Sequence, residues 1–291
     1  MSHSESGSGL PNYIYGDGSS GDVTISANTN LTSDMYYNTL VVNAGFALDT
    51  AGYRVFVKNE CEVYGSIHNN GNDASGTIGG AIVASAVLGG GTAGANGRNN
   101  SSGNGTAGTA LTANADGGQG GTGGNSSGGR TGAAGGAMTV TPAAEGGSNV
   151  MGTFPCCFWG KTFSTATTNY VNGGSGGGSG ACTDTTGTTR AGAGGGGAGV
   201  LILCARILFG SGTISCNGGN GGDGYATSTS ANAGGGGGGG GGVVVVISST
   251  DMDTTGLTIT ANGGVGGTAI YVGATNGADG SSGKVYKIIA G

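Results

Sequence analysis

The chain has 291 residues, of which 74 are glycine, and its 9 lysine and arginine residues against 15 acidic ones give a net charge of −6. Charged residues make up only 8% of the chain, against about 25% in ordinary globular proteins, and the three prolines exclude collagen. The lack of an 18-residue apolar stretch excludes a membrane-spanning helix. The acidic balance without a basic cluster disfavours nucleic acid and anionic membranes as partners.

The chain is expected to open with a flexible lead-in over residues 1–20, which are polar and glycine-bearing. No basic segment followed by an apolar one occurs there, so the sequence predicts no secretory signal. Apolar and polar residues alternate at 53–57 and 62–64, with β-branched and aromatic side chains, which is typical of half-buried strands. Residues 21–72 are therefore predicted to form an all-β module that packs or docks.

An internal repeat follows from three similar segments, 66–71, 213–219 and 258–264, each ending in Asn-Gly. Each segment is preceded by an apolar strand and runs on into a glycine-rich stretch. Stacked copies of such a unit predict a solenoid-like or parallel β arrangement. The last strands and the last glycine run are assigned to a segment covering residues 243–291.

The glycine-rich stretches repeat with a period of three, most regularly over 117–135. Three residues per turn is the period of the polyproline II helix, whose outward N–H and C=O groups need partners. A hydrated linker is one solution, and side-by-side packing of such helices is the other. The glycine runs directly adjoin apolar segments that are predicted as strands, which favours packing over a hydrated linker. The sequence therefore favours an all-β fold in which the N-terminal module is followed by a glycine-rich polyglycine/polyproline II helix bundle with interleaved, stacked strands. The bundle is assigned to residues 73–242, with an aromatic insertion at 148–190.

The runs 192–199 and 234–242, together with the period-three stretches, make the chain resemble glycine-rich bacteriophage virion proteins. The phrases 30–42 and 52–57 also resemble a β module of phage fibre-like proteins. The nearest analogues are the tip adhesins of T-even-like long tail fibres. This resemblance implies a lattice of polyglycine helices that presents variable, aromatic-bearing loops at its exposed end.

Aromatic residues interrupt the glycine pattern at 148–172, which contains the one tryptophan of the chain. Two interpretations stay open: an exposed loop that binds a receptor, or a hydrophobic plug that covers the bundle or a subunit contact. Under the first interpretation the hypothetical receptor-binding residues are Phe158, Trp159, Lys161, Tyr170, Tyr225 and Tyr271.

The six cysteines have no zinc-type spacing, so packed thiols are expected, with a staple from Cys182 to Cys156 or Cys157 as the alternative. The segment 218–226 matches a single calcium-binding nonapeptide, but such sites need tandem copies. His3 and His68 are the two imidazoles, and Asp251 and Asp253 have the setting of turn formers. We therefore predict no catalytic residues, no metal and no cofactor.

These features predict a non-enzymatic virion appendage, a tail fibre or adhesin made in the host cytoplasm without a signal peptide. Expected partners are other virion proteins, bound through the N-terminal module, and a host-surface glycan or outer-surface protein. A homo-oligomer or part of an oligomeric fibre is expected, and no nucleic acid. The alternatives are a purely structural virion protein, such as a capsid-decorating or fibre-shaft protein, and an ice-binding polyglycine bundle.

Overall fold

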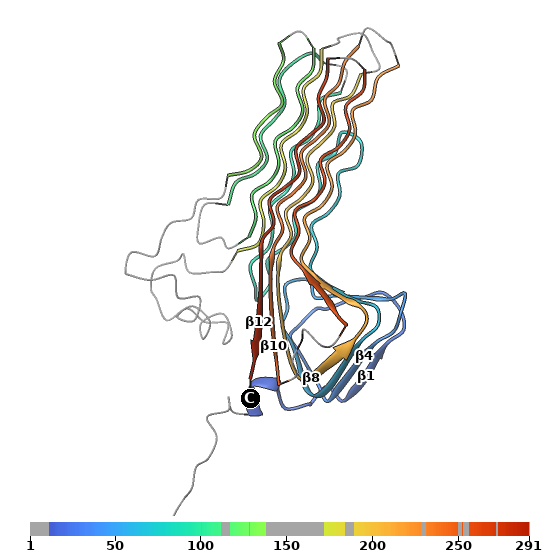
Figure 1. Ribbon diagram of the computed structural model, residues 1–291, viewed down its shortest axis with the longest axis vertical. Helices are drawn as coiled ribbons and strands as arrows, with labels where there is room; N and C mark the ends of the chain where they lie inside the picture. Colours follow the sequence, from blue (N-terminus) through green and yellow to red (C-terminus); the bar gives the residue numbers. More distant parts are fainter. Residues whose placement is uncertain are drawn as a thin grey trace, which may run out of the picture.

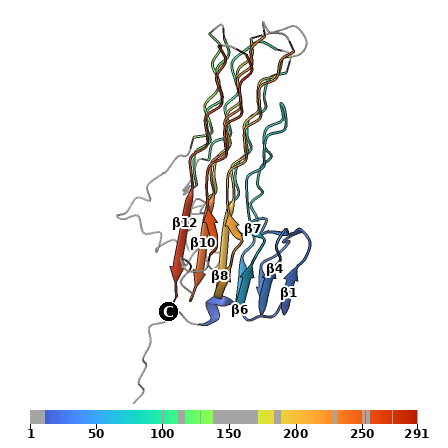
Figure 2. The ribbon, with the colours of Figure 1, turned by 45° about the vertical axis from the view of Figure 1, so that its right-hand side comes forward.

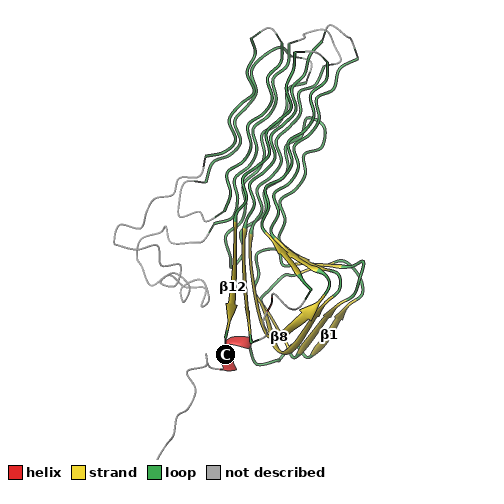
Figure 3. Cartoon of the chain, in the orientation of Figure 1, coloured by secondary structure: helices red, strands yellow, loops and turns green. Residues whose placement is uncertain are grey.

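The computed structural model describes most of the chain outside the N-terminus and the aromatic insertion. The described residues are 12–99, 101–111, 117–127, 129–137, 172–183, 189–227, 231–249, 252, 256–271 and 273–290. Strands gather at one end, and long segments without regular secondary structure extend side by side from them (Figures 1 and 3). Almost no helix is present among these residues apart from the 3₁₀ helix η1 (Asn12–Tyr15).

Two parallel sheets form the strand-rich end. The first has the order β1-β4-β6-β8-β10-β12, with β3 also paired to β6, and the second has the order β11-β9-β7-β5-β2. The first sheet comprises β1 (Asp22–Ile25), β3 (Met35–Tyr37), β4 (Thr39–Val42), β6 (Val55–Val63), β8 (Val200–Gly210), β10 (Val243–Ser248) and β12 (Lys284–Ile289). The second comprises β2 (Thr29–Asn30), β5 (Ala47–Asp49), β7 (Ser66–His68), β9 (Thr213–Ser215) and β11 (Thr258–Thr260).

The chain passes from one sheet to the other in successive coils, because β1, β4, β6, β8 and β10 each lead to the next strand of the second sheet. The predicted all-β, parallel and stacked character is confirmed. The three repeat segments lie in adjacent strands in exact register: Ile67 pairs with Ile214, and Ile214 with Ile259. Their side chains point inward because alternate residues of a strand face the same side of the sheet.

The hydrophobic core lies between the two sheets. Leu48, Ile67, Leu203 and Ile214 are fully buried there. The other face of the first sheet carries a second cluster that includes Ile202 and Val245. Strands β8 and β10 are therefore buried on both faces over much of their length, which is why their sequences show apolar runs instead of alternation.

The glycine-rich segments leave the second sheet, turn at the far end and return to the first sheet. For example, the chain runs up through 216–227 after β9 and returns through 231–242 into β10. Figure 2 shows these segments continuing the direction of the strands. We call them together the glycine array; its runs are 69–75, 78–83, 89–99, 101–111, 117–127, 129–137, 172–183, 189–199, 216–227, 231–242, 261–270 and 273–283.

Main-chain hydrogen bonds join neighbouring runs of the array with a three-residue period. In the run 231–242, every third N–H donates to the same neighbour: Gly234, Gly237 and Gly240 bond to the run 172–183 at 2.8–2.9 Å. The two other sets of N–H groups donate to the runs 216–227 and 273–283. Its carbonyl oxygens accept from three further runs, 117–127, 189–199 and 261–270. This buried run thus bonds in turn to neighbours on all sides.

Glycine is required at these positions because the main chains approach so closely. A Cβ built at Gly237 would lie far inside 3.0 Å from the carbonyl oxygen of Gly121, a distance that real Cβ atoms essentially never show. The same holds for Gly234 against Gly124 and for Gly240 against Gly118.

The structure interrupts the period-three stretch at 117–135. Residues 117–127 and 129–137 are separate runs that meet in a turn, where Ser126 pairs with Arg130 and Gly129 has a φ of 77°.

Strands from residues 22–68 share both sheets with strands from 200–289. The expected boundaries at 72 and 242 therefore separate strands that the structure joins in the same sheets.

Replacing Gly237 by alanine is expected to destabilise the protein, since the methyl group must push against the Gly121 carbonyl. Overpacking of this kind costs about 1–3 kcal/mol. Gln119→Ala, an exposed site in the neighbouring run 117–127, is the control and should change the free energy of unfolding by less than about 0.5 kcal/mol. Denaturant unfolding of both variants measures the difference, and equal stabilities would contradict the close approach.

Candidate functional site

The array ends opposite the sheets in a set of turns that we call the distal end, described over 98–103, 125–127, 129–131, 182–183, 189–190, 225–227, 231–233 and 268–275. Arg190 and Tyr225 meet there on adjacent runs. Their main chains exchange two hydrogen bonds of 2.7 and 2.8 Å, and the Arg190 guanidinium carbon lies 5.8 Å from the centre of the Tyr225 ring. The cation–π contact holds both side chains although Tyr225 is 50% exposed.

Tyr271 lies at the end of a run that borders the run of Tyr225, because the Gly224 N–H donates to the Thr268 carbonyl at 2.8 Å. The Tyr271 side chain is 37% exposed. Its backbone has a φ of 66°, in the left-handed region that costs a bulky residue of order 1–3 kcal/mol. A glycine would relieve this cost, so the backbone alone gives no reason for an aromatic residue at this position.

Three arginines carry positive charge in the described part of the distal end. Arg98 lies beside Arg190, since the Ala191 N–H donates to the Arg98 carbonyl. The Arg98 Nε donates to the Asn104 carbonyl at 2.5 Å. Arg130 is exposed in the turn that ends the run 117–127. Along these runs, the Asp223 carboxylate already accepts hydrogen bonds from the N–H and hydroxyl of Thr268. The described part of this end therefore suits acidic or neutral polar ligands.

The structure brings together two of the six residues predicted to bind a receptor. Tyr225 and Tyr271 lie at the same end on adjacent runs, while Phe158, Trp159, Lys161 and Tyr170 fall outside the described residues. The receptor-binding role of all six stays a prediction. The sequence analysis did not single out the arginines, because they lie far apart in the chain and form no basic cluster. Arg98, Arg130 and Arg190 each stand where a glycine run meets a polar turn, and that shared position was the available signal.

The segment 218–226 uses its polar side chains to join runs. The Asn220 Oδ1 accepts from the Val265 N–H at 2.9 Å, and Asp223 binds Thr268 as described. The same arrangement occurs at the repeat, where the Asn217 N–H donates to the Asn70 Oδ1 and the Asn217 Oδ1 accepts from the Asn262 N–H. In the described part of the chain, no group of three or more His, Cys, Asp or Glu side chains is placed to hold a metal ion.

Asp49, His68 and Ser215 form one row across β5, β7 and β9 and are the residue types of a hydrolase triad. Their hydrogen bonds do not connect them in that way. The Ser215 hydroxyl donates to the Asn70 Oδ1 at 3.0 Å, and the Asp49 carboxylate accepts from the Ala51 N–H at 2.9 Å. The buried His68 Nδ1 has no hydrogen-bond partner. The row therefore lacks the base-to-nucleophile bond that activates a serine.

Cys61, Cys204 and Cys216 are buried thiols of the core. Burial raises the pKa of Cys61 to about 12, with a further contribution from the negative charge of Glu62. Burial likewise raises the pKa values of Cys204 and Cys216. Cys182 is also buried, while Cys156 and Cys157 lie outside the described residues, so the alternative of a staple between them stays a prediction.

Comparisons with known proteins add no family assignment: no family model, curated protein or solved structure matches the chain significantly. Within the described ranges, no helix has both the length and the apolar character needed to cross a bilayer.

The pKa of Cys61 predicts a loss of stability in alkali. The folded protein holds the thiol proton more tightly than the unfolded chain, whose thiol titrates near pH 9.0. The contribution of the protonated Cys61 thiol to the free energy of unfolding is therefore complete below pH 9. It is lost as the pH rises toward 12, and the free energy of unfolding then falls by at most about 1.4 kcal/mol per pH unit. Urea unfolding at several values between pH 8 and 11 should show a shallower decline for Cys61→Ala. Identical slopes for the two proteins would contradict this account.

Proposed function

We propose that this protein is a non-enzymatic bacteriophage virion appendage, of the tail-fibre or adhesin type, whose distal end contacts the host surface. The observation that carries the proposal is the position of exposed aromatic and cationic side chains at the end of a glycine array, opposite the sheets. Tyr225, Tyr271 and Arg190 have the side-chain types that dominate protein-binding surfaces.

We further propose that the array is a bundle of polyglycine II helices, the form that the sequence favours. Support comes from the three-residue period of the hydrogen bonds in the run 231–242, since three residues complete one turn of a polyproline II-type helix. Further support is the lack of space for a Cβ at Gly234, Gly237 and Gly240. A fibre X-ray or infrared signature of polyglycine II in the purified protein would test this assignment.

Rigidity is the physical reason why such an array suits an adhesin. Ordering one residue costs about 1–2 kcal/mol of backbone entropy, and the array meets this cost through main-chain bonds made during folding. A preformed distal end then binds a receptor without a second ordering cost. The turns can vary in sequence while the runs below them keep their spacing.

The opposite end of the molecule is the proposed attachment to other virion proteins. The first sheet ends in β1 on one side, and an edge strand of this kind can pair its outer N–H and C=O groups with a further strand. Pairing with another virion protein or with another copy of the chain would build the oligomeric fibre that the sequence predicts. Under this proposal the protein is located in the virion.

The proposal predicts that Trp159→Ala and Tyr225→Ala each weaken adsorption of the particles to their host cells. Loss of an aromatic anchor at an interface typically costs about 2 kcal/mol or more, or at least tenfold in affinity. Adsorption rate constants of purified particles provide the measurement, and the amount of the protein per particle shows whether assembly is intact.

Gln119→Ala, which lies along the array and away from its distal end, is the matched control and should adsorb normally. Normal adsorption of both aromatic variants would exclude a receptor-binding role for these side chains. Antibody labelling of intact particles separates the remaining possibilities: a label on the capsid or along a shaft would favour the purely structural alternative.

A further inference from the structure

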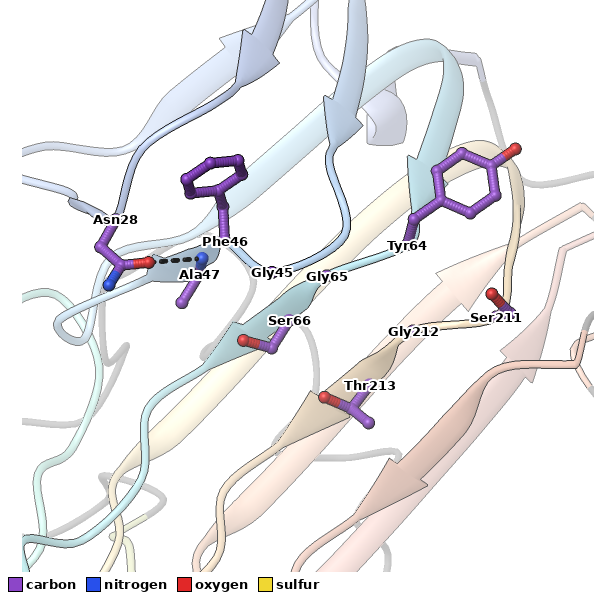
Figure 4. Close-up of a pocket in the computed structure, with 10 residues that line it drawn as sticks. All are labelled: Asn28, Gly45, Phe46, Ala47, Tyr64, Gly65, Ser66, Ser211, Gly212 and Thr213. Atoms are coloured by element: carbon purple, nitrogen blue, oxygen red, sulfur yellow. Dashed lines mark hydrogen bonds between the residues drawn. The ribbon is translucent and has the colours of Figure 1, made fainter.

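A shallow groove of about 540 Å³ lies at the strand-rich end, where the chain turns from the first sheet into the second. Its lining comes from the turns of four successive coils: Asn28 between β1 and β2, residues 45–47 before and in β5, residues 64–66 before and in β7, and residues 211–213 before and in β9 (Figure 4). The groove therefore runs across the strands, along the direction in which the coils stack.

Glycines make the floor of this groove smooth and keep it close to the main chain. A Cβ at Gly65 would collide with the Phe46 carbonyl, and one at Gly212 would collide with the Gly65 carbonyl. Main-chain bonds fix the floor: the Ser66 N–H donates to the Phe46 carbonyl, and the Thr213 N–H to the Gly65 carbonyl, both at 3.0 Å. The shape thus exists before any ligand arrives.

Two aromatic residues line the groove, Tyr64 and Phe46, and Phe46 is partly buried and also packs against the core. Figure 4 shows Phe46 and Tyr64 on either side of Gly45 and Gly65. Tyr64 is 43% exposed, although its hydroxyl is oriented by a hydrogen bond of 3.1 Å to the Glu62 carboxylate. An exposed ring held in one direction offers an apolar face without a large loss of side-chain entropy on binding.

Hydroxyl groups occupy the floor beside the rings. The side chains of Ser66, Ser211 and Thr213 line the groove, and none of their hydroxyls bonds to another described residue. Each hydroxyl can donate one hydrogen bond and accept two. No lining residue is charged, so the groove has nothing to neutralise an ionic ligand, and the nearby Glu62 carboxylate disfavours an anion.

We propose that this groove binds a linear, uncharged oligosaccharide lying across the coils. Sugar rings present C–H faces that pack on aromatic rings, and hydroxyls that exchange hydrogen bonds with Ser66, Ser211 and Thr213. Adjacent strands are about 4.8 Å apart, which is comparable with the length of one pyranose ring, so successive rings meet equivalent turns. The inference does not depend on receptor binding at the distal end, which lies at the other end of the array.

Saturation-transfer NMR of the full-length protein with neutral linear hexasaccharides of glucose, mannose and N-acetylglucosamine tests the proposal. At least one is expected to bind, and Tyr64→Ala should weaken its binding at least tenfold. Tyr64→Phe keeps the ring and should remain within about threefold, because the hydroxyl points to Glu62. Thr213→Val, which removes a floor hydroxyl at nearly constant volume, should also weaken binding.

Tyr225→Ala is the matched control, since it removes an exposed tyrosine of the distal end and should leave hexasaccharide binding unchanged. No saturation transfer from any of the three sugars overturns the proposal, as does binding that is unaffected by both Tyr64→Ala and Thr213→Val. Preference for an anionic hexagalacturonate over all neutral sugars would also overturn it. Because adsorption measures the distal end and this experiment measures the groove, either proposal can fail while the other holds.

Discussion

The structure depends on how closely two main chains can approach when neither carries a side chain. At Gly237 and its counterparts the neighbouring carbonyl occupies the space of a Cβ, and this approach lets N–H and C=O groups of different runs pair at 2.8–2.9 Å. A buried main-chain group without a partner costs about 1–3 kcal/mol. Each run therefore needs its neighbours, and the array orders as a unit.

The sheets supply what the array lacks, which is hydrophobic burial. Leu201, Leu203 and Val244 lie in the core between the sheets, and β8 and β10 continue directly from the runs 189–199 and 231–242. Because β8 and β10 pair in a fixed register, the two runs that continue into them are also held in a fixed register. The Asn70 and Asn217 side chains lie at the junction, where the Asn70 Oδ1 accepts from the Asn217 N–H and the Asn217 Oδ1 accepts from the Asn262 N–H. The repeat thus contributes both strands to the sheets and links between the runs.

Exposed aromatic and cationic side chains occupy places where the main chain turns. The distal end carries Arg190 and Tyr225, and the turns between the sheets carry Phe46 and Tyr64. Along the runs, polar side chains such as Asp223 and Asn220 are used instead for hydrogen bonds between neighbours. The turns include positions that lack the close approach seen at Gly237, so they can hold large and charged groups.

Much of the architecture was predictable from the sequence, because the alternation at 53–57 and the three Asn-Gly segments depend on local periodicity and on self-similarity. The parallel, stacked strands follow from these patterns. The turn at Ser126–Arg130, which interrupts the glycine period, was not predictable, since a period of three continues equally well through a straight run or a reversal. Tertiary structure also decided which runs are neighbours, and hence that Arg98 lies beside Arg190 and that Phe46 and Tyr64 flank one groove. Glycine runs have nearly identical surfaces, so their own sequences do not fix their order in space, and the runs that adjoin strands take their places from those strands.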